Sequence, residues 1–159
     1  MEKYFEKGEL DEDEIKTGMK KAMINHDLFP LFCLSAERNM GSGRLMGFID
    51  NVCPSANEMP PQGSTKGEDI GCDASKPVCA FVYKAISEPH VGELSFMKVF
   101  SGTLKSGMDL INETTGVSEK LNQLFVMEGN KRNNVSELSA GDIGATLKLK
   151  NTHVNNTLH

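Results

Sequence analysis

Apolar residues near the start of the chain recur with helical spacing. Between Ile15 and Met23 they fall at i, i+4, i+7 and i+8, so they share one face of a helix. Asp11 followed three residues later by Glu14 is the pattern of a capping box. Together these features predict an amphipathic helix over Leu10–Ile24.

One strand and a second helix complete the pattern of residues 1–55. The apolar run Pro30–Leu34 is short and continuous, which is typical of a buried strand. The segment Arg44–Val52 has apolar residues at i, i+3, i+4 and i+7, and Pro54 follows its end. A single strand is too little for a complete nucleotide-binding fold, because such a sheet needs several βα units. We therefore expect residues 1–55 to be an incomplete α/β piece with the order helix, strand, helix.

From Pro77 onward the spacing of apolar residues falls to about two, the period of strands. Turn residues interrupt this pattern at short intervals, as they do in small sandwiches and barrels. Closing a barrel removes exposed strand edges, so we expect residues 77–159 to form a closed antiparallel β-barrel. A loop crossing is expected over Met127–Leu138. The predicted strands are Val78–Ile86, Gly92–Phe100, Met108–Ile111, Glu119–Met127 and Ile143–Leu149.

The stretch Val91–Gly107 has the sequence VGELSFMKVFSGTLKSG and organises the second half of the chain. Met97 and Phe100 break its strict alternation of apolar residues. The strand is therefore buried on both faces or carries a bulge. Gly102 and Gly107 supply backbone positions where a positive φ costs little, which favours a tight reversal between them.

Residues 56–76 separate the two regions. Proline, glycine and charged residues are frequent there and apolar periodicity is almost absent, which predicts a linker. The predicted organisation is residues 1–55 as a helix-strand-helix domain piece, residues 56–76 as the linker and residues 77–159 as the barrel.

Composition is that of an ordinary globular protein, with 38% hydrophobic and 25% charged residues. No apolar run approaches the length of a membrane span, and the acidic start is unlike a secretory signal, so we expect a cytoplasmic protein without a membrane partner. The cysteines form no CxxC pair and do not cluster with histidines, so we expect reduced packing residues and no metal site. They are Cys33, Cys53, Cys72 and Cys79.

The formal net charge of −5 is concentrated in residues 1–76, where acids outnumber bases, whereas residues 77–159 are balanced. The acidic half is a poor candidate for non-specific nucleic-acid binding. The neutral half can contact RNA only through local basic positions.

Two segments resemble nucleotide-binding motifs but depart from them. Gly41-Ser42-Gly43 with Gly47 lacks the G-x-G-x-x-G spacing, which favours a plain loop leading into a helix. Asn130-Lys131-Arg132-Asn133 resembles the guanine-reading N-K-x-D, but Asn133 replaces the aspartate and the segment lies among strands, so we interpret it as an exposed turn.

The chain contains no G-x-x-x-x-G-K-[ST] phosphate loop. Without that loop there is no amide cradle and no lysine for the β- and γ-phosphates. No Ser-His-Asp or Cys-His constellation can be specified either. We therefore predict no catalytic residues and no enzymatic activity for this chain by itself.

The string Val91–Gly107 closely resembles the opening of the second domain of elongation factor G, the bacterial translocation GTPase. The family pattern is VG-x-L-(S/T)-F-x-(K/R)-V-(F/Y)-SG-x-L-K-x-G, and the match is ungapped. Later markers of that domain are Ala140-Gly141-Asp142-Ile143 and the segment from Leu149-Lys150 to Thr157-Leu158. Asn155-Asn156 stands where the family prefers Gly-Asp.

Residues 4–55 resemble the end of the first, GTP-binding domain of the same family. YFEKGELDEDEIKTGMKKAM is similar to the helix before its last guanine-binding motif. Cys33-Leu34-Ser35-Ala36 resembles that motif, usually C-G-S-A, with Leu34 departing from the glycine. Cys53-Pro54-Ser55 resembles the exit to the second domain. These departures favour a diverged paralogue over a standard housekeeping copy.

The resemblance implies the end of a P-loop GTPase domain followed by a translation-factor β-barrel, cut from a longer ribosomal translocase. Ser35 and Ala36 match the guanine site, where backbone N–H groups would contact the base, but alone they cannot hold GTP or its Mg²⁺. The implied partners are the other domains of the parent protein and small-subunit ribosomal RNA. Lys98 and Lys105 match basic or polar family positions and are the RNA-contact candidates, by phosphate contacts.

Two alternatives stay open. One is another translational GTPase of the ribosomal-protection or release-factor type with the same barrel, against which the ungapped Val91–Gly107 match argues. The other is a stand-alone β-barrel interaction module, against which the Ser35-Ala36 motif argues. Whether the parent hydrolyses GTP is left open, because its catalytic residues lie outside this sequence.

Overall fold

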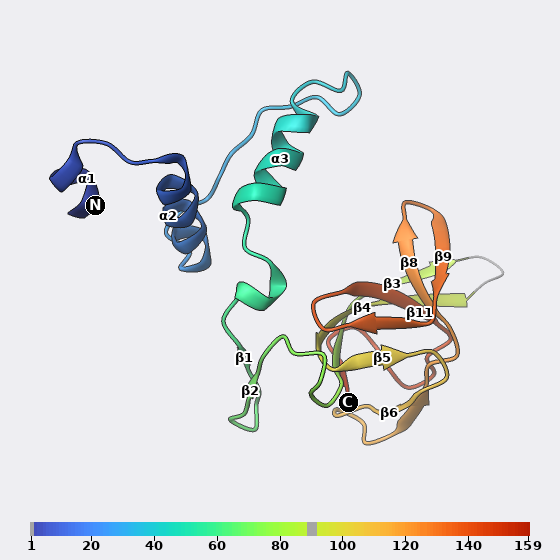
Figure 1. Ribbon diagram of the computed structural model, residues 1–159. Helices are drawn as coiled ribbons and strands as arrows, with labels where there is room; N and C mark the ends of the chain where they lie inside the picture. Colours follow the sequence, from blue (N-terminus) through green and yellow to red (C-terminus); the bar gives the residue numbers. More distant parts are fainter. Residues whose placement is uncertain (1, 89–91) are drawn as a thin grey trace. The chain divides into compact units, whose positions relative to one another are not determined.

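The computed structural model describes residues 2–88 and 92–159 (Figure 1). Its contacts divide the chain into two compact units, with the boundary between Pro60 and Pro61. The predicted linker, residues 56–76, is therefore shared between the two units. It contains the short helix η1 (Ala56–Glu58) and the hairpin of β1 (Gln62–Gly63) and β2 (Asp69–Ile70).

The first unit is helical, with α1 (Glu2–Lys7), α2 (Glu12–Ile24) and α3 (Ser42–Val52). The predicted capping box of α2 is confirmed. The Asp11 side chain accepts the Glu14 N–H at 2.8 Å, and the Glu14 carboxyl accepts the Asp11 N–H at 3.3 Å. Sequence periodicity missed α1, which is one and a half turns long and carries no apolar repeat.

The predicted strand Pro30–Leu34 is wrong. The segment runs without helix or strand structure, and the nearest pairing is the isolated bridge between Ser35 and Met40. A strand is stable only when a neighbouring strand satisfies its N–H and C=O groups. No other strand occurs between residues 2 and 60, so this run has nothing to pair with.

The first unit has almost no core. Among residues 4–60, Val52 is the single buried side chain. Leu31 lies in the run predicted to be a buried strand and is 91% exposed, and Phe29, next to that run, is 77% exposed. Apolar side chains of α3 are exposed too, including Met46 and Ile49. This unit therefore leaves unburied the surface that usually stabilises a domain.

The second unit is built from antiparallel strands around one core. A six-stranded sheet has the order β12-β3-β4-β11-β8-β9, and β10-β5 and β6-β7 form two further antiparallel pairs. The interior cluster includes Val82, Met97, Val99, Leu104 and Leu121, each 0% exposed. The strands are β3 (Cys79–Glu88), β4 (Gly92–Ser101), β5 (Thr103–Lys105), β6 (Asp109–Ile111), β7 (Ser118–Lys120), β8 (Leu124–Glu128), β9 (Lys131–Val135), β10 (Glu137–Ser139), β11 (Ile143–Leu147) and β12 (Thr157–Leu158).

Three details of this unit differ from the sequence prediction. The predicted strand Glu119–Met127 is two strands, because Leu121 turns from the β6-β7 ladder toward β8 and exchanges hydrogen bonds with Gly107 and Met108. The expected loop crossing at Met127–Leu138 is wrong, since β9 and β10 lie there. A turn at Gly129 and Asn130 joins β8 to β9 in a hairpin (Figure 1).

The third difference lies between Gly102 and Gly107, where the expected tight reversal is a short strand, β5, paired with β10. Gly102 has φ +76°, and a Cβ built there would lie 2.6 Å from Val78 Cα and 2.7 Å from Val78 N. Gly107 has φ +85° with open space around it. Both positions need a left-handed backbone, but Gly102 also needs the absence of a side chain.

Strand β4 meets both conditions that the sequence left as alternatives. Met97 and Val99 face the interior core, whereas Leu94 is buried on the opposite face in a second cluster with Phe125. The β3-β4 register also shifts between Cys79 and Ala80, which leaves Phe100 without a partner in the ladder. The strand is thus buried on both faces and bulged.

A buried polar network fixes the loop that precedes β12. Glu119 is only 5% exposed. Its carboxyl group accepts hydrogen bonds from the Lys150 N–H at 3.1 Å, from the Asn151 N–H and from the Thr152 hydroxyl at 3.3 Å. Asn112, which is fully buried, donates to Thr152 Oγ1 at 3.1 Å. Each buried polar atom in this network thereby finds a partner, which keeps its desolvation cost low.

Asn112 extends the network to Asn156, the second of the two asparagines that replace the Gly-Asp preferred by the family. Its side-chain amide also donates to Asn156 Oδ1 at 3.0 Å. Asn155 adopts φ +72°, a left-handed conformation that glycine favours and asparagine tolerates. The replacement therefore preserves both the backbone geometry and an acceptor oxygen.

We predict that Gly102→Ala destabilises the second unit much more than Gly107→Ala. Both changes place an L side chain at positive φ, which costs about 1 kcal/mol. Gly102→Ala additionally drives a Cβ into the Val78 backbone, so its loss of unfolding free energy should be at least about twice as large. Urea unfolding followed by circular dichroism measures both losses, and equal losses would contradict the close approach to Val78.

We predict that Glu119→Ala lowers the unfolding free energy by about 3 kcal/mol, because several donors of the 150–152 segment lose their acceptor. The exposed Glu137→Ala is the control and should cost less than about 1 kcal/mol. The same urea unfolding curves decide the question. A Glu119→Ala midpoint that coincides with that of the control would show that the network does not hold the loop.

Candidate nucleic-acid interface

Lys98 lies on the face of β4 that is turned away from the interior core. Its neighbours Met97 and Val99 point into that core, so alternation places Lys98 outside. The Lys98 ammonium is 5.0 Å from the centre of the Phe100 ring, within the range of a cation–π interaction. Directly across the ladders are Phe81 on β3 and Ile143 on β11.

A second lysine reaches the same face through a bulge. The β3-β4 register shifts between Val82 and Lys84, so Tyr83 is an extra residue on β3. Val82 faces inward opposite Met97, and without the extra residue Lys84 would face inward as well. The shift instead sets Lys84 opposite Phe96. Bulges commonly redirect side chains in this way.

Lys84 uses this position to cap an aromatic ring. Its ammonium lies 5.4 Å from the centre of the Phe96 ring, and the Tyr83 ring is 6.4 Å from Phe96. We refer to Lys84, Phe96, Lys98 and Phe100 as the cation–aromatic face. It combines two ammonium groups with rings that are half-buried in the sheet surface.

The other strand lysines lie opposite carboxylates. Lys105 is paired with Glu137, Lys120 with Asp109, and Lys131 with Glu128. Directly opposed charges of opposite sign attract, so each of these lysines has a local counter-charge. Lys84 and Lys98 are instead opposed by aromatic and aliphatic side chains. Of the two candidates Lys98 and Lys105, only Lys98 therefore belongs to the cation–aromatic face.

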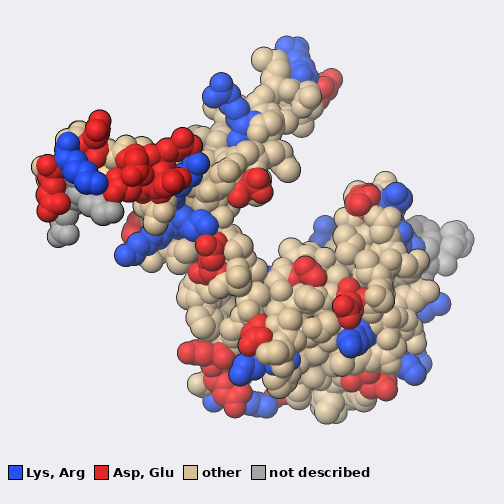
Figure 2. Space-filling view, viewed as in Figure 1, with Lys and Arg blue, Asp and Glu red and all other residues tan. Residues whose placement is uncertain are grey.

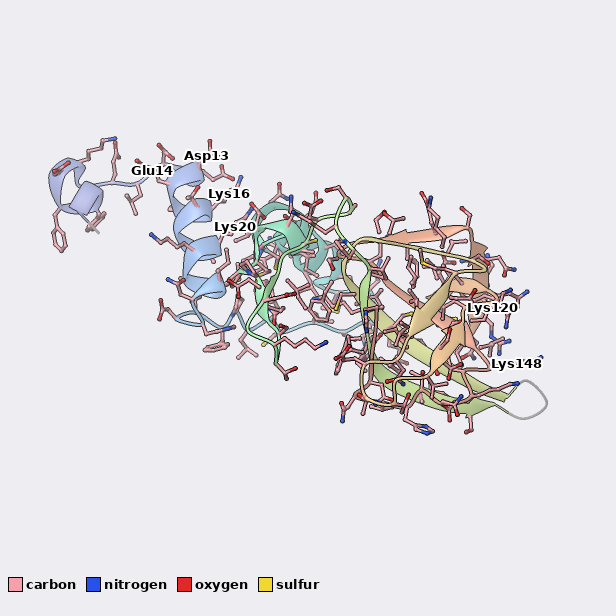
Figure 3. All side chains as sticks on the ribbon, turned by 90° about the horizontal axis from the view of Figure 1, so that it is seen from below. Asp13, Glu14, Lys16, Lys20, Lys120 and Lys148 are labelled. Carbon is pink, nitrogen blue, oxygen red and sulfur yellow. The ribbon has the colours of Figure 1, made fainter. Side chains whose placement is uncertain are left out.

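Charges elsewhere are distributed differently. Acidic side chains gather on the first unit over α2, whereas both signs are interspersed over the visible face of the second unit (Figure 2). On α2, Lys16 and Lys20 are one turn apart and extend from the same side of the helix (Figure 3). Lys16 pairs with Glu12 at 2.8 Å and Lys20 with Glu58 at 2.9 Å. These lysines are thus engaged in ion pairs.

Contacts of this kind lower the pKa of several carboxyl groups: the hydrogen bond from Lys16 lowers the pKa of Glu12, and the pKa values of Glu58 and Glu113 are lowered as well. Hydrogen bonds from the Ser55 backbone, and from Lys20 and the Ser55 hydroxyl, lower the pKa of Glu58 to about 2. The hydrogen bond from Lys66, at 2.6 Å, lowers the pKa of Glu113. Glu58 and Glu113 both belong to surface ion pairs that tie neighbouring segments together within their own units, and neither lies on the cation–aromatic face.

Ser35 and Ala36 occupy a small closed turn before α3. Ser35 and Met40 exchange two backbone hydrogen bonds, at 3.0 and 2.9 Å, and Asn39 takes φ +51° inside the turn. The Ser35 N–H is therefore already used within the turn. Ser35 and Ala36 belong to the first unit, whereas Lys98 and Lys105 belong to the second.

The motif-like segments have structural roles. Gly41 is the N-cap of α3 with φ +78°, and Gly43 and Gly47 lie inside that helix. Asn130 belongs to the turn of the β8-β9 hairpin, but Lys131 to Asn133 continue as strand, so the interpretation as an exposed turn holds only for its first residue.

Three further features bear on function in the described part of the chain: its cysteines, its metal-ligating side chains and the length of its helices. All four cysteines are free, and burial raises the pKa of the Cys79 thiol, which disfavours its reactive thiolate. Among residues 2–88 and 92–159, no three His, Cys, Asp or Glu side chains gather so as to hold a metal ion. No helix in the same residues is long and apolar enough to cross a membrane.

Sequence reasoning missed three members of the cation–aromatic face. The alternation Phe96-Lys98-Phe100 signals a shared face and was available in the sequence. Lys84 carried no such signal, because its side depends on the extra residue Tyr83. Register shifts follow from how two strands pair, which the sequence of one strand does not reveal.

Residues 77–159 match the family described as elongation factor G domain 2. The chain belongs to the elongation factor G domain 2 family. This match covers the whole strand-rich part from Pro77 and confirms the resemblance seen in Val91–Gly107. The second unit is accordingly a translation-factor β-barrel domain of the translational GTPase family.

A solved structure extends the likeness beyond that domain. The chain is similar to a crystal structure of a protein from Thermus thermophilus, with a TM-score of 0.74 and 26% identity. The similarity covers 99% of this chain and 22% of that chain. This chain thus spans about a fifth of the length of the solved protein that it resembles, and it is an elongation factor G-like segment that contains domain 2.

Proposed function

We propose that this chain is part of a translational GTPase of the elongation factor G type, acting in the cytoplasm on the ribosome during polypeptide elongation. The observation that carries the proposal is the match of residues 77–159 to elongation factor G domain 2. The ungapped Val91–Gly107 string supports the translocase type within the translational GTPases. In such a protein this chain supplies a structural and ribosome-contacting part, and the hydrolysis of GTP belongs to the parent.

We further propose that the first unit is the C-terminal portion of the GTPase domain. Its exposed apolar residues support this, because Phe29 and Leu31 would be buried if the run Pro30–Leu34 joined a sheet. The lone buried residue, Val52, shows how little core the unit makes by itself. A parallel sheet of the same parent protein is the partner that this extended segment fits.

The nucleotide proposal is limited to the parent protein. GTP and its Mg²⁺ need a phosphate loop and carboxylate or hydroxyl ligands, which the described residues do not assemble. Ser35 and Ala36 would contribute only to the guanine end of the site. The chain on its own therefore does not fit the complete nucleotide.

We predict that this chain shows no saturable binding of a fluorescent GTP analogue, with or without Mg²⁺. The phosphates contribute most of the charge that a GTPase recognises, and their cradle lies outside this sequence. Fluorescence titration against the chain and against Ser35→Ala checks this expectation. Saturable binding to the unmodified chain would overturn the assignment of Ser35 and Ala36 as an insufficient remnant.

For the barrel, we propose a contact with small-subunit ribosomal RNA in which Lys98 approaches phosphates. Lys98 has no opposing carboxylate, whereas Lys105 faces Glu137. An ammonium without a carboxylate on the neighbouring strand gains more from contacting RNA phosphates than one with a negative charge opposite it. This difference supports Lys98 as the contact and makes Lys105 a matched control.

We predict that the chain co-sediments with bacterial ribosomes and small subunits at low salt, and that Lys98→Ala weakens binding more than Lys105→Ala. Loss of one phosphate contact should lower the salt slope of binding by about one for Lys98→Ala. Sedimentation at several salt concentrations gives both quantities. Equal losses in the two variants would reject the assignment to Lys98, and no sedimentation of the unmodified chain would reject this chain as a ribosome-contacting part.

A further inference from the structure

We propose that the cation–aromatic face binds unpaired RNA by stacking bases on its aromatic rings while its lysines contact the phosphates. The inference deepens the proposed function, on which it rests for the identity of its RNA partner. It is distinct from a phosphate contact alone, because it requires bases that are free to leave a duplex.

The geometry supplies both elements of such a site on one strand face. Phe96, Lys98 and Phe100 alternate along β4, and Lys84 stands beside Phe96 on β3. Each ring therefore lies close to an ammonium group, with centroid distances of 5.4 and 5.0 Å. Single-strand binding proteins combine the same two elements, cations that follow the backbone and aromatic rings that stack with bases.

The charge of the face favours an anionic partner. Within the ladder rows of Phe96 and Lys98, the paired residues on β3, β11, β8, β9 and β12 include no acid among the described residues. These paired residues are Lys84, Ala145, Phe125, Asn134, Phe81, Ile143 and Thr157. Although residues 77–159 are balanced in charge, this face is locally cationic because the carboxylates face other lysines.

Apolar surface beside the lysines is open to a ligand. Ile143, opposite Lys98, is 55% exposed, and Tyr83, beside Phe96, is 40% exposed. The ammonium groups occupy the ring surfaces through cation–π contacts, which at exposed sites are weaker than base–aromatic stacking. A base can therefore displace an ammonium from a ring, and the flexible lysine then reaches the adjacent phosphate.

Unpaired RNA fits this face better than a duplex. In an A-form duplex the bases are stacked on one another, so their faces are closed to aromatic rings, and a flat sheet face reaches only base edges, 2′-hydroxyls and phosphates. Rings embedded in a sheet gain their binding energy from bases that have been turned outward. Phe96, which also packs on the cluster of Leu94 and Phe125, and Phe100 can stack only with bases turned outward in this way.

The test measures binding of the full chain to a fluorescein-labelled oligouridylate of about ten nucleotides and to an RNA duplex of similar length, by fluorescence anisotropy at several salt concentrations. We expect the single strand to bind more tightly than the duplex. Lys84→Ala and Lys98→Ala should each reduce the single-strand salt slope by about 0.7. Phe100→Leu should weaken binding about tenfold with the salt slope unchanged, because it removes stacking but no charge.

The controls separate this surface from general electrostatics. Lys105→Ala, opposite Glu137, should leave the affinity unchanged. Urea unfolding of each variant verifies folding, and Tyr83→Leu, at an exposed position, replaces Phe100→Leu if that variant is unfolded. Polyglutamate as a competitor tests for an acidic protein partner, and we expect it to compete poorly.

Several outcomes overturn the inference. Equal affinity for strand and duplex, an unaffected aromatic variant, or efficient competition by polyglutamate would each exclude base stacking on this face. Absence of oligouridylate binding together with Lys98-dependent ribosome sedimentation would reject the inference and leave the proposed function standing. Oligouridylate binding with the expected variant pattern but no ribosome sedimentation would keep the surface and reject the ribosomal role.

Discussion

The buried carboxyl group of Glu119 is the interaction on which the second unit most depends. It gathers donors from Lys150, Asn151 and Thr152, and Asn112 joins Thr152 to Asn156. The loop thus fixed delivers β12 to the edge of β3, where Leu158 enters the interior core. Pairing with β12 on one side and β4 on the other holds β3 in register, so a polar network on one side of the barrel supports the sheet face that carries Lys84 and Lys98.

The two units differ in how far they bury their apolar side chains and pair their strands internally. The barrel buries a continuous apolar cluster and pairs its strands internally, whereas the first unit has Val52 as its single buried side chain among residues 4–60. The helices of the first unit nevertheless form, because local signals such as the Asp11–Glu14 capping box act without tertiary partners. The strand Pro30–Leu34 does not form, because a strand has no local substitute for a neighbour.

The sequence was a good guide wherever structure depends on nearby residues. It predicted α2 with its cap, α3, the antiparallel β unit and β4 with its bulge. It failed where pairing decides: the β9 and β10 strands are short and polar, and their existence follows from the Gly129-Asn130 turn and from partners on β8 and β5. The counter-charges opposite Lys105, Lys120 and Lys131 depend on cross-strand register in the same way. The guanine-site residues Ser35 and Ala36 and the RNA-contact candidates Lys98 and Lys105 stay predictions.

The extra residue Tyr83 changes which side chains of β3 face the core and which face solvent. Before Tyr83 and after it, the alternation of inward-facing and outward-facing side chains along β3 is out of step by one residue. Relatives that lack this residue would present a different set of side chains to solvent while sharing almost every letter of the strand. Alignments that place a gap a few positions away would compare interior residues with surface residues, so the surface chemistry of this sheet is comparable between relatives only after the bulge has been aligned.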